Sequence, residues 1–161
     1  GDSPTTFIFS RQVMPPLENP YSKANAAGYI VQYAEKPDLT FAANGSDVYL
    51  CCQAAEILRK EGLSVRIVSV MSPRLFMDLP QKEREALIPR WSPAFAVSSG
   101  LPSVFAPVVG PLGCSWGLSE FGKSAPFAVL EKEFGYTPGA VAEKAKAYLA
   151  SYKEMRRELC S

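Results

Sequence analysis

The sequence contains no histidine in its 161 residues. Histidine titrates near neutral pH without help from its surroundings, and it is the commonest general acid or base in enzymes. Acid–base catalysis by this chain alone would therefore need a glutamate, lysine or cysteine with a strongly shifted pKa. The absence argues against a self-sufficient enzyme, and we assign no catalytic residue within the chain.

Long apolar runs and an excess of charge are also missing. No run approaches the roughly 18 apolar residues of a membrane-spanning helix, and no basic stretch followed by an apolar one opens the chain as in a signal peptide. The formal net charge is +1, from 17 Lys and Arg against 16 Asp and Glu. No global field therefore favours nucleic acid or a membrane surface, and we expect a cytoplasmic protein with neither as partner.

The four cysteines form no CxxC pair of the kind that zinc sites use. Unpaired cysteine behaves as a small hydrophobe in a reducing compartment. We therefore expect free thiols and no metal site in this chain. The residues concerned are Cys51, Cys52, Cys114 and Cys160.

The composition that is present suits one globular domain with a real core, since 47% of the residues are hydrophobic and 20% are charged. The sequence starts at Gly1 without a methionine and soon reaches an apolar run at 7–9. We therefore expect a piece of a longer protein. Residues 1–37 have the texture of an entry segment, with one β-type run at 5–10 and a turn-rich stretch at 14–20.

From residue 38 onward, strand and helix patterns alternate without an internal repeat. The apolar run 39–43 and the run 64–70, which is rich in branched residues, flank a helical pattern, which is a βαβ unit with parallel strands. This alternation of strands and helices predicts an α/β fold: a three-layer α/β/α sandwich around a mostly parallel sheet of about five strands. The other predicted strands are 95–98 and 104–109, and the predicted helices are 47–61, 73–79, 81–88, 126–134 and 138–158.

Residues with special helix-end roles support these bounds. Ser46 is predicted to cap the first helix, Ser72 the second and Thr137 the last. Gly62 and Gly135 stand where a left-handed residue ends a helix.

Ligands of parallel sheets gather at the carboxyl ends of the strands, where loops 44–46 and 71–73 are expected. Gly45 and Ser46 could form an anion site, because free N–H groups and the helix dipole attract phosphate or carboxylate. The alternative is a plain helix cap, which is favoured because Asp47 would repel an anion. Loop 122–124 offers a similar choice, but it lacks the glycine spacing of a P-loop, so we interpret it as packing and capping.

Three ordered stretches carry a family resemblance. Residues 44–50 match a G-S-E/D-V strand-turn-helix entrance, and 61–70 match E-G-hydrophobic-x-V-R-V-V-S. Residues 121–137 match F-G-x-S-A-P followed by E-E-F-G-F-T. In these motifs and their order, the chain resembles the C-terminal domain of transketolase.

The N-terminal stretch extends the resemblance. Phe9-Ser10-Arg11-Gln12, followed by Pro15 and Leu17, is similar to the S-R-Q-x-x-P-x-L strand end of the family's middle, pyrimidine-binding domain. The resemblance implies that residues 1–37 are the tail of that domain and a linker, and that 38–161 are the C-terminal domain. It also implies that Arg11 helps to hold the phosphate of the substrate, which suits a planar, permanently charged guanidinium.

Departures from the family pattern are concentrated in two places. Ser98-Ser99-Gly100 stands where many members have an acidic residue in V-E-A-G, and Leu101-Pro102-Ser103 replaces a glycine-tryptophan step. Glu120 occupies a position where arginine is common. These changes indicate a divergent relative.

The resemblance implies an enzyme only as the full-length protein. A transketolase transfers a two-carbon ketol unit between sugar phosphates, with thiamine diphosphate and a divalent metal, Mg or Ca, held by upstream domains. We expect the isolated chain to be inactive, to bind no cofactor, and to serve assembly plus one substrate-phosphate contact. The implied partner is its own upstream part or a separate N-terminal subunit, within a homodimer.

Two alternatives remain open at this point. The chain could be a non-catalytic module that binds a small anion or regulates another protein through loop 44–46 or 122–124. It could also belong to an enzyme with a different reaction, because synthases that condense pyruvate with a sugar phosphate and the β subunits of 2-oxo-acid dehydrogenases share this domain type. The S-R-Q stretch favours transketolase.

Overall fold

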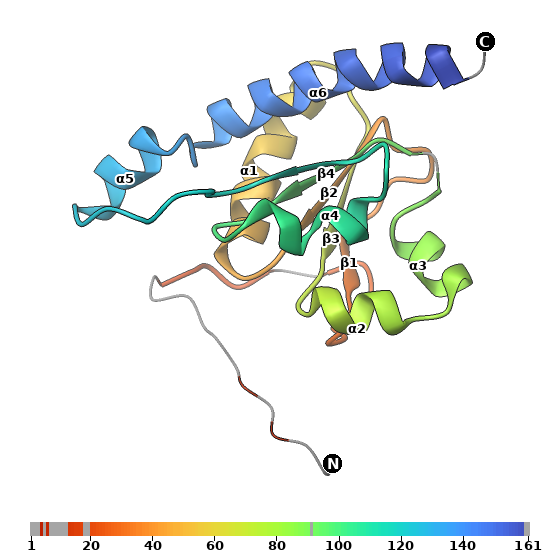
Figure 1. Ribbon diagram of the computed structural model, residues 1–161, viewed down its shortest axis with the longest axis horizontal. Helices are drawn as coiled ribbons and strands as arrows, with labels where there is room; N and C mark the ends of the chain where they lie inside the picture. Colours follow the sequence, from red (N-terminus) through yellow and green to blue (C-terminus); the bar gives the residue numbers. More distant parts are fainter. Residues whose placement is uncertain (1–3, 5, 7–12, 18–19, 91, 160–161) are drawn as a thin grey trace.

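The sheet has five strands in the order β1-β3-β2-β4-β5, and helices cover both of its faces (Figure 1). The computed structural model describes residues 4, 6, 13–17, 20–90 and 92–159. Four strands are parallel to one another, whereas β1 pairs with β3 in the antiparallel sense. The predicted α/β sandwich with a mostly parallel sheet is confirmed. The strands are β1 (Tyr29–Gln32), β2 (Leu39–Ala43), β3 (Val65–Ser69), β4 (Ala94–Val97) and β5 (Cys114–Trp116).

Strand β2 lies at the centre and is buried on both faces. It pairs in parallel with β3 on one side and with β4 on the other. Leu39 and Phe41 point into one apolar cluster and Ala42 into the other. An unbroken apolar run is what a strand with two covered faces requires.

The two layers of helices bury different clusters. Helices α1 (Ser46–Lys60) and α6 (Pro138–Leu159) cover one face. The opposite face is covered by short helices, and α5 extends beyond the carboxyl ends of the strands (Figure 1). The short helices on the opposite face are α2 (Pro73–Asp78), α3 (Gln81–Leu87), the 3-10 turn η1 (Pro102–Val104) and α4 (Ala106–Val109), whereas α5 spans Phe127–Glu133.

The strand predicted at 104–109 is wrong, because this segment forms the end of η1 and then α4. Phe105, Val108 and Val109 are buried at i, i+3 and i+4, which is the spacing of one helix face. Pro107 also lacks the N–H that an internal strand must donate.

Strands β1 and β5 were not predicted. Strand β5 has only three residues, too few to show an alternating pattern, and β1 follows Gly28 in a segment interpreted as linker. The predicted domain boundary between residues 37 and 38 stays a prediction, although β1 lies before it and pairs with β3.

Most predicted helix ends are confirmed. The hydroxyl of Ser72 accepts from the N–H of Leu75 at 3.3 Å, and that of Thr137 accepts from Ala140 at 3.3 Å. Gly62 and Gly135 have positive φ of 90° and 75°. The exception is the start of α1, where Gly45 is the N-cap with φ 53° and Ser46 is the first helical residue, without a side-chain cap bond.

Arg66, on β3, is a buried cation. Its structural role was not predicted from the sequence. Its guanidinium donates to the carbonyls of Ala34, Ala86 and Leu87 at 2.7 to 3.2 Å. The last two carbonyls belong to the end of α3, where a cation also suits the helix dipole. Burial lowers the pKa of this guanidinium, and its bonds join the sheet to the α2–α3 layer.

Tyr148 fastens α6 to the amino end of β4. Its hydroxyl donates to the carbonyl of Leu112 at 2.9 Å and accepts from the N–H of Ala94 at 3.1 Å. Burial raises the pKa of this phenol well above its ordinary value. The hydroxyl thus satisfies two backbone groups that would otherwise be buried without a partner.

Replacing Tyr148 with Phe is expected to lower the free energy of unfolding by about 1 to 3 kcal/mol, because it leaves the N–H of Ala94 and the carbonyl of Leu112 unsatisfied. Urea denaturation followed by circular dichroism measures the change. Tyr33→Phe, at an exposed ring, is the control and should shift stability by less than about 0.5 kcal/mol. Equal effects of the two variants would contradict the assignment.

Candidate functional site

Three loops meet at the carboxyl edge of the sheet. Loops 44–46, 71–73 and 98–100 follow the carboxyl ends of β2, β3 and β4. These strands are parallel and adjacent, so the loops lie at one edge, as predicted for the first two. This edge is where ligands of such sheets bind.

Asp47, in the first turn of α1, is the central polar group of this edge. Its side chain is 5% exposed. Its carboxylate accepts from the N–H of Ser99 at 2.7 Å and from the hydroxyl of Ser99 at 2.6 Å. Two short bonds to one residue join the start of α1 to the loop after β4.

Burial raises the pKa of Asp47, and the two bonds from Ser99 partly oppose this shift. Burial also raises the pKa of the Cys51 thiol well above its ordinary value, and the negative charge of Asp47 adds to that shift. Both effects favour neutral forms of these side chains. Neither group gains the character of a nucleophile or a cofactor ligand.

Ser98, Ser99 and Gly100, where the sequence departs from the family pattern, take part in a network of hydrogen bonds. The buried hydroxyl of Ser98 accepts from the N–H of Gly100 at 3.1 Å. The Tyr136 hydroxyl donates to the carbonyl of Ser98 at 2.6 Å. Burial, followed by the charge of Asp47, raises the pKa of Tyr136 to about 12, so the phenol stays a donor at neutral pH.

A mostly apolar groove of about 620 Å³ opens beside this network. Its walls come from the start of α1, from α5 and from the N-terminal segment at 13–15. Asp47, Ser99 and Lys123 are among its polar groups. The apolar side chains that line it are Val13, Met14, Pro15, Leu50, Leu118, Phe127, Leu130 and Phe134.

Of the residues proposed to bind anions, Gly45 is exposed and Ser46 is half-buried in the wall of the groove. The adjacent Asp47 carboxylate lies in the same wall, which disfavours an anion there. Arg11 lies outside the described residues.

Loop 121–126 does not pack as predicted, since each of its residues is exposed. Lys123 pairs with Glu133 of α5 and lies 5.9 Å from the centre of the Phe134 ring. The loop is therefore held to α5 at its surface. The residue before α5, Pro126, makes no side-chain cap bond.

The described residues hold no group of three or more His, Cys, Asp or Glu side chains that could bind a metal ion. Cys51, Cys52 and Cys114 are free thiols, as predicted, and Cys160 lies outside the described residues. No helix in this part of the chain is both long enough and apolar enough to cross a membrane.

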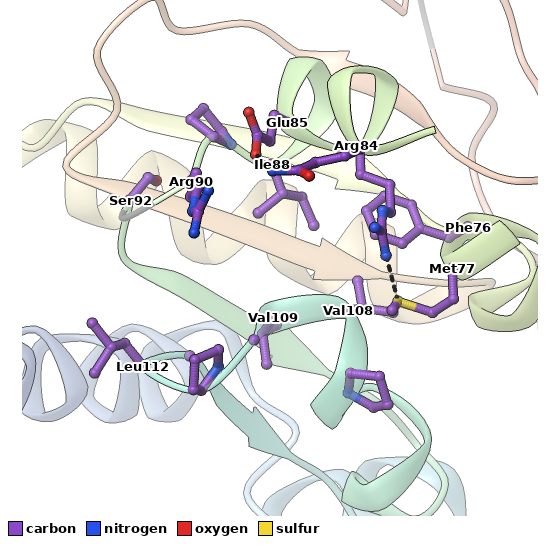
Figure 2. A pocket seen from close by; sticks show the side chains of 16 residues that line it. Phe76, Met77, Arg84, Glu85, Ile88, Arg90, Ser92, Val108, Val109 and Leu112 are labelled. Carbon is purple, nitrogen blue, oxygen red and sulfur yellow. Dashed lines mark hydrogen bonds between the residues drawn. The ribbon is translucent and has the colours of Figure 1, made fainter. Parts of the chain in front are cut away.

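A second cavity, of about 290 Å³, lies between α3 and the segment around α4 (Figure 2). Ile88, Val108 and Val109 line it with apolar atoms, and Arg84 donates to the Met77 sulfur at 3.8 Å. Ser92 also lines this cavity and lies just before β4, so the cavity is near the amino ends of the parallel strands. It is therefore separate from the groove at the carboxyl edge.

Comparison with known proteins identifies the family. The model of the transketolase-like C-terminal domain matches residues 27–137. The chain belongs to the transketolase family. Transketolase 1 of Escherichia coli K12 is 38% identical over 153 residues, which are 92% of this chain and 23% of that relative.

Solved transketolase structures agree with the fold. A mutant transketolase from Pichia stipitis is 30% identical and superimposes with a TM-score of 0.78, covering 89% of this chain and 21% of that one. A split-gene transketolase, described as an inactive β4 tetramer, matches with a TM-score of 0.64 at 20% identity, over 87% of this chain and 48% of that one. This second likeness shows the fold alone. The chain spans about a fifth of the length of the curated transketolases it matches.

Replacing Ser99 with Ala is expected to lower the free energy of unfolding by about 1 to 2 kcal/mol at pH 7, because the buried Asp47 carboxylate loses a hydrogen-bond donor. The variant also raises the folded-state pKa of Asp47 further. The destabilisation should therefore be full above that pKa and shrink as pH falls through it, since the neutral carboxyl depends less on Ser99.

Urea denaturation between pH 4 and 8 checks this dependence. Ser103→Ala, at an exposed position of η1, is the matched control and should have little effect at any pH. A loss that stays constant across the range would show that the hydroxyl does not act through the Asp47 charge.

Proposed function

We propose that this chain is the C-terminal domain of a transketolase that transfers a two-carbon ketol unit between sugar phosphates, and that the isolated chain does not catalyse the reaction. The observation that carries the proposal is the family match over residues 27–137, combined with relatives between four and five times as long. The missing histidine agrees with it, because acid–base groups must then come from elsewhere.

Thiamine diphosphate and a divalent metal are the cofactors implied by the family. The described residues do not fit them: they contain no cluster of metal-ligating side chains. The buried carboxylate of Asp47 is engaged by Ser99, and a diphosphate near it would meet a like charge. We place both cofactors on the upstream part of the enzyme and derive no step through them.

The proposed partner is that upstream part, in the same chain or as a separate subunit of a dimeric enzyme. The split-gene transketolase gives a precedent for this domain type in a separate subunit. A small-anion-binding module is less well supported, because the Asp47 carboxylate lies next to Gly45 and Ser46 in the wall of the groove and would repel an anion there.

Arg11 is the residue of this chain for which we propose a direct contact with substrate. Its S-R-Q context matches the strand end that carries a phosphate-binding arginine in the family. A guanidinium can give two parallel hydrogen bonds to phosphate oxygens and stays charged at every physiological pH. Its role is to bind and orient the phosphate end of the sugar, away from the reacting carbons.

Replacing Arg11 with Ala in the full-length enzyme is expected to raise KM for a phosphorylated sugar about tenfold or more, since a charge-assisted contact is lost. The value of kcat should change much less. Steady-state kinetics with a sugar phosphate and with its unphosphorylated counterpart measure the effect.

The unphosphorylated sugar should show little difference between the wild type and the variant. Arg11→Lys is the matched variant and should fall between them, because lysine keeps the charge but not the bidentate geometry. A similar loss with both sugars, or no loss at all, would remove Arg11 from the phosphate site.

A further inference from the structure

Most of the exposed large apolar side chains among the described residues lie at the carboxyl edge of the sheet. Ten large apolar side chains are exposed among the described residues, and eight of them lie in segments that follow the carboxyl ends of the parallel strands β2 to β5 or line the groove there. The other two, Tyr21 and Tyr33, stack on each other with ring centroids 4.4 Å apart. The eight, which we call the carboxyl-edge face, are Val13, Met71, Leu75, Leu101, Val104, Phe121, Phe127 and Val129.

The degree of exposure is large for side chains of this kind. Phe121 is 99% exposed, Phe127 55% and Leu101 57%. Single apolar side chains on a surface are ordinary, whereas a group beside an apolar groove marks a place where another molecule binds. The segments that carry this face are the start of α2, η1, loop 121–126 and α5, and each follows the carboxyl end of one of the parallel strands β3, β4 and β5.

We propose that the carboxyl-edge face and its groove are the surface on which the thiamine-diphosphate-binding part of the enzyme docks. The inference rests on the proposed function. It assigns to an interface the edge of the sheet that other α/β domains commonly use for a ligand.

The path of the chain favours this occupant. Val13, Met14 and Pro15, which the family resemblance assigns to the tail of the preceding domain, line the groove themselves. A domain connected at this point is held beside the face at high effective concentration. The matched relatives are also more than four times as long as the stretch that this chain covers.

Two charged groups of the groove, Asp47 and Lys123, already have partners within the chain, which lowers the cost of covering them. Asp47 accepts two bonds from Ser99, and Lys123 is paired with Glu133. A partner therefore need not compensate these charges itself, and contact between apolar side chains can drive the association.

Hydroxyl-radical footprinting tests the proposal on this chain alone and on the full enzyme, whether the thiamine-binding part is fused or supplied as a separate subunit. We expect the modification rates of Met71, Phe121 and Phe127 to fall roughly fivefold or more in the enzyme. Tyr21 and Tyr33 are the internal controls, and their rates should change less than about twofold.

A matched pair of variants adds a functional measurement. Phe127→Glu should weaken association with the thiamine-binding part about tenfold or more, because it places a charge in an apolar contact. Ala150→Glu, which adds the same charge at an exposed position of α6, should leave it within about twofold. Both variants should keep the circular dichroism spectrum and melting temperature of the chain alone.

The outcomes separate the two proposals. An active assembly with an unprotected carboxyl-edge face would overturn the docking surface and leave the proposed function intact. Failure of the two parts to form an active assembly would overturn both. Protection that appears in this chain alone as its concentration rises would assign the face to a second copy and overturn the proposed occupant.

Discussion

Burial of β2 on both faces is the constraint on which the rest of the structure depends. All of its residues are buried, so a layer of helices must pack on each face of the sheet. Strands must also pair along both of its edges. Because its neighbours β3 and β4 run parallel to it, their following loops all emerge at one edge. The position of Asp47 beside Ser99, and of the groove next to them, follows from that arrangement.

The sequence predicted the elements whose patterns are long or marked by special residues. The βαβ unit around α1 has an apolar strand, a strand rich in branched residues, a helical face and Gly62 at its turn, and its architecture followed from these signals. The strand predicted at 104–109 was wrong because it rested on a short run bounded by glycine and proline, although Phe105, Val108 and Val109 have helical spacing and Pro107 opposes a strand. The short β1 and β5 depend on pairing with distant strands, which no local pattern contains.

The candidate site was predictable in place but not in content. Topology alone put loops 44–46 and 71–73 at the carboxyl edge, and the repulsion of an anion by Asp47 remains a prediction. Its bonds to Ser99, 52 residues away, could not be read from the sequence. The same holds for the groove, whose walls join segments that lie more than a hundred residues apart. Two sequence features could have suggested the contact between Asp47 and Ser99. They are the acidic residue at the start of the first helix and the polar V-S-S-G stretch at the end of a parallel strand.

The central claim is that this domain contributes to ketol transfer only together with a thiamine-binding part. The most direct measurement is the rate of two-carbon transfer between sugar phosphates, with thiamine diphosphate and magnesium, for the chain alone, for the thiamine-binding part alone and for the two together. The account predicts turnover only in the combined sample, with a rate that saturates at equimolar chains. Turnover by this chain alone, or by the thiamine-binding part at an equal rate without it, would contradict the account.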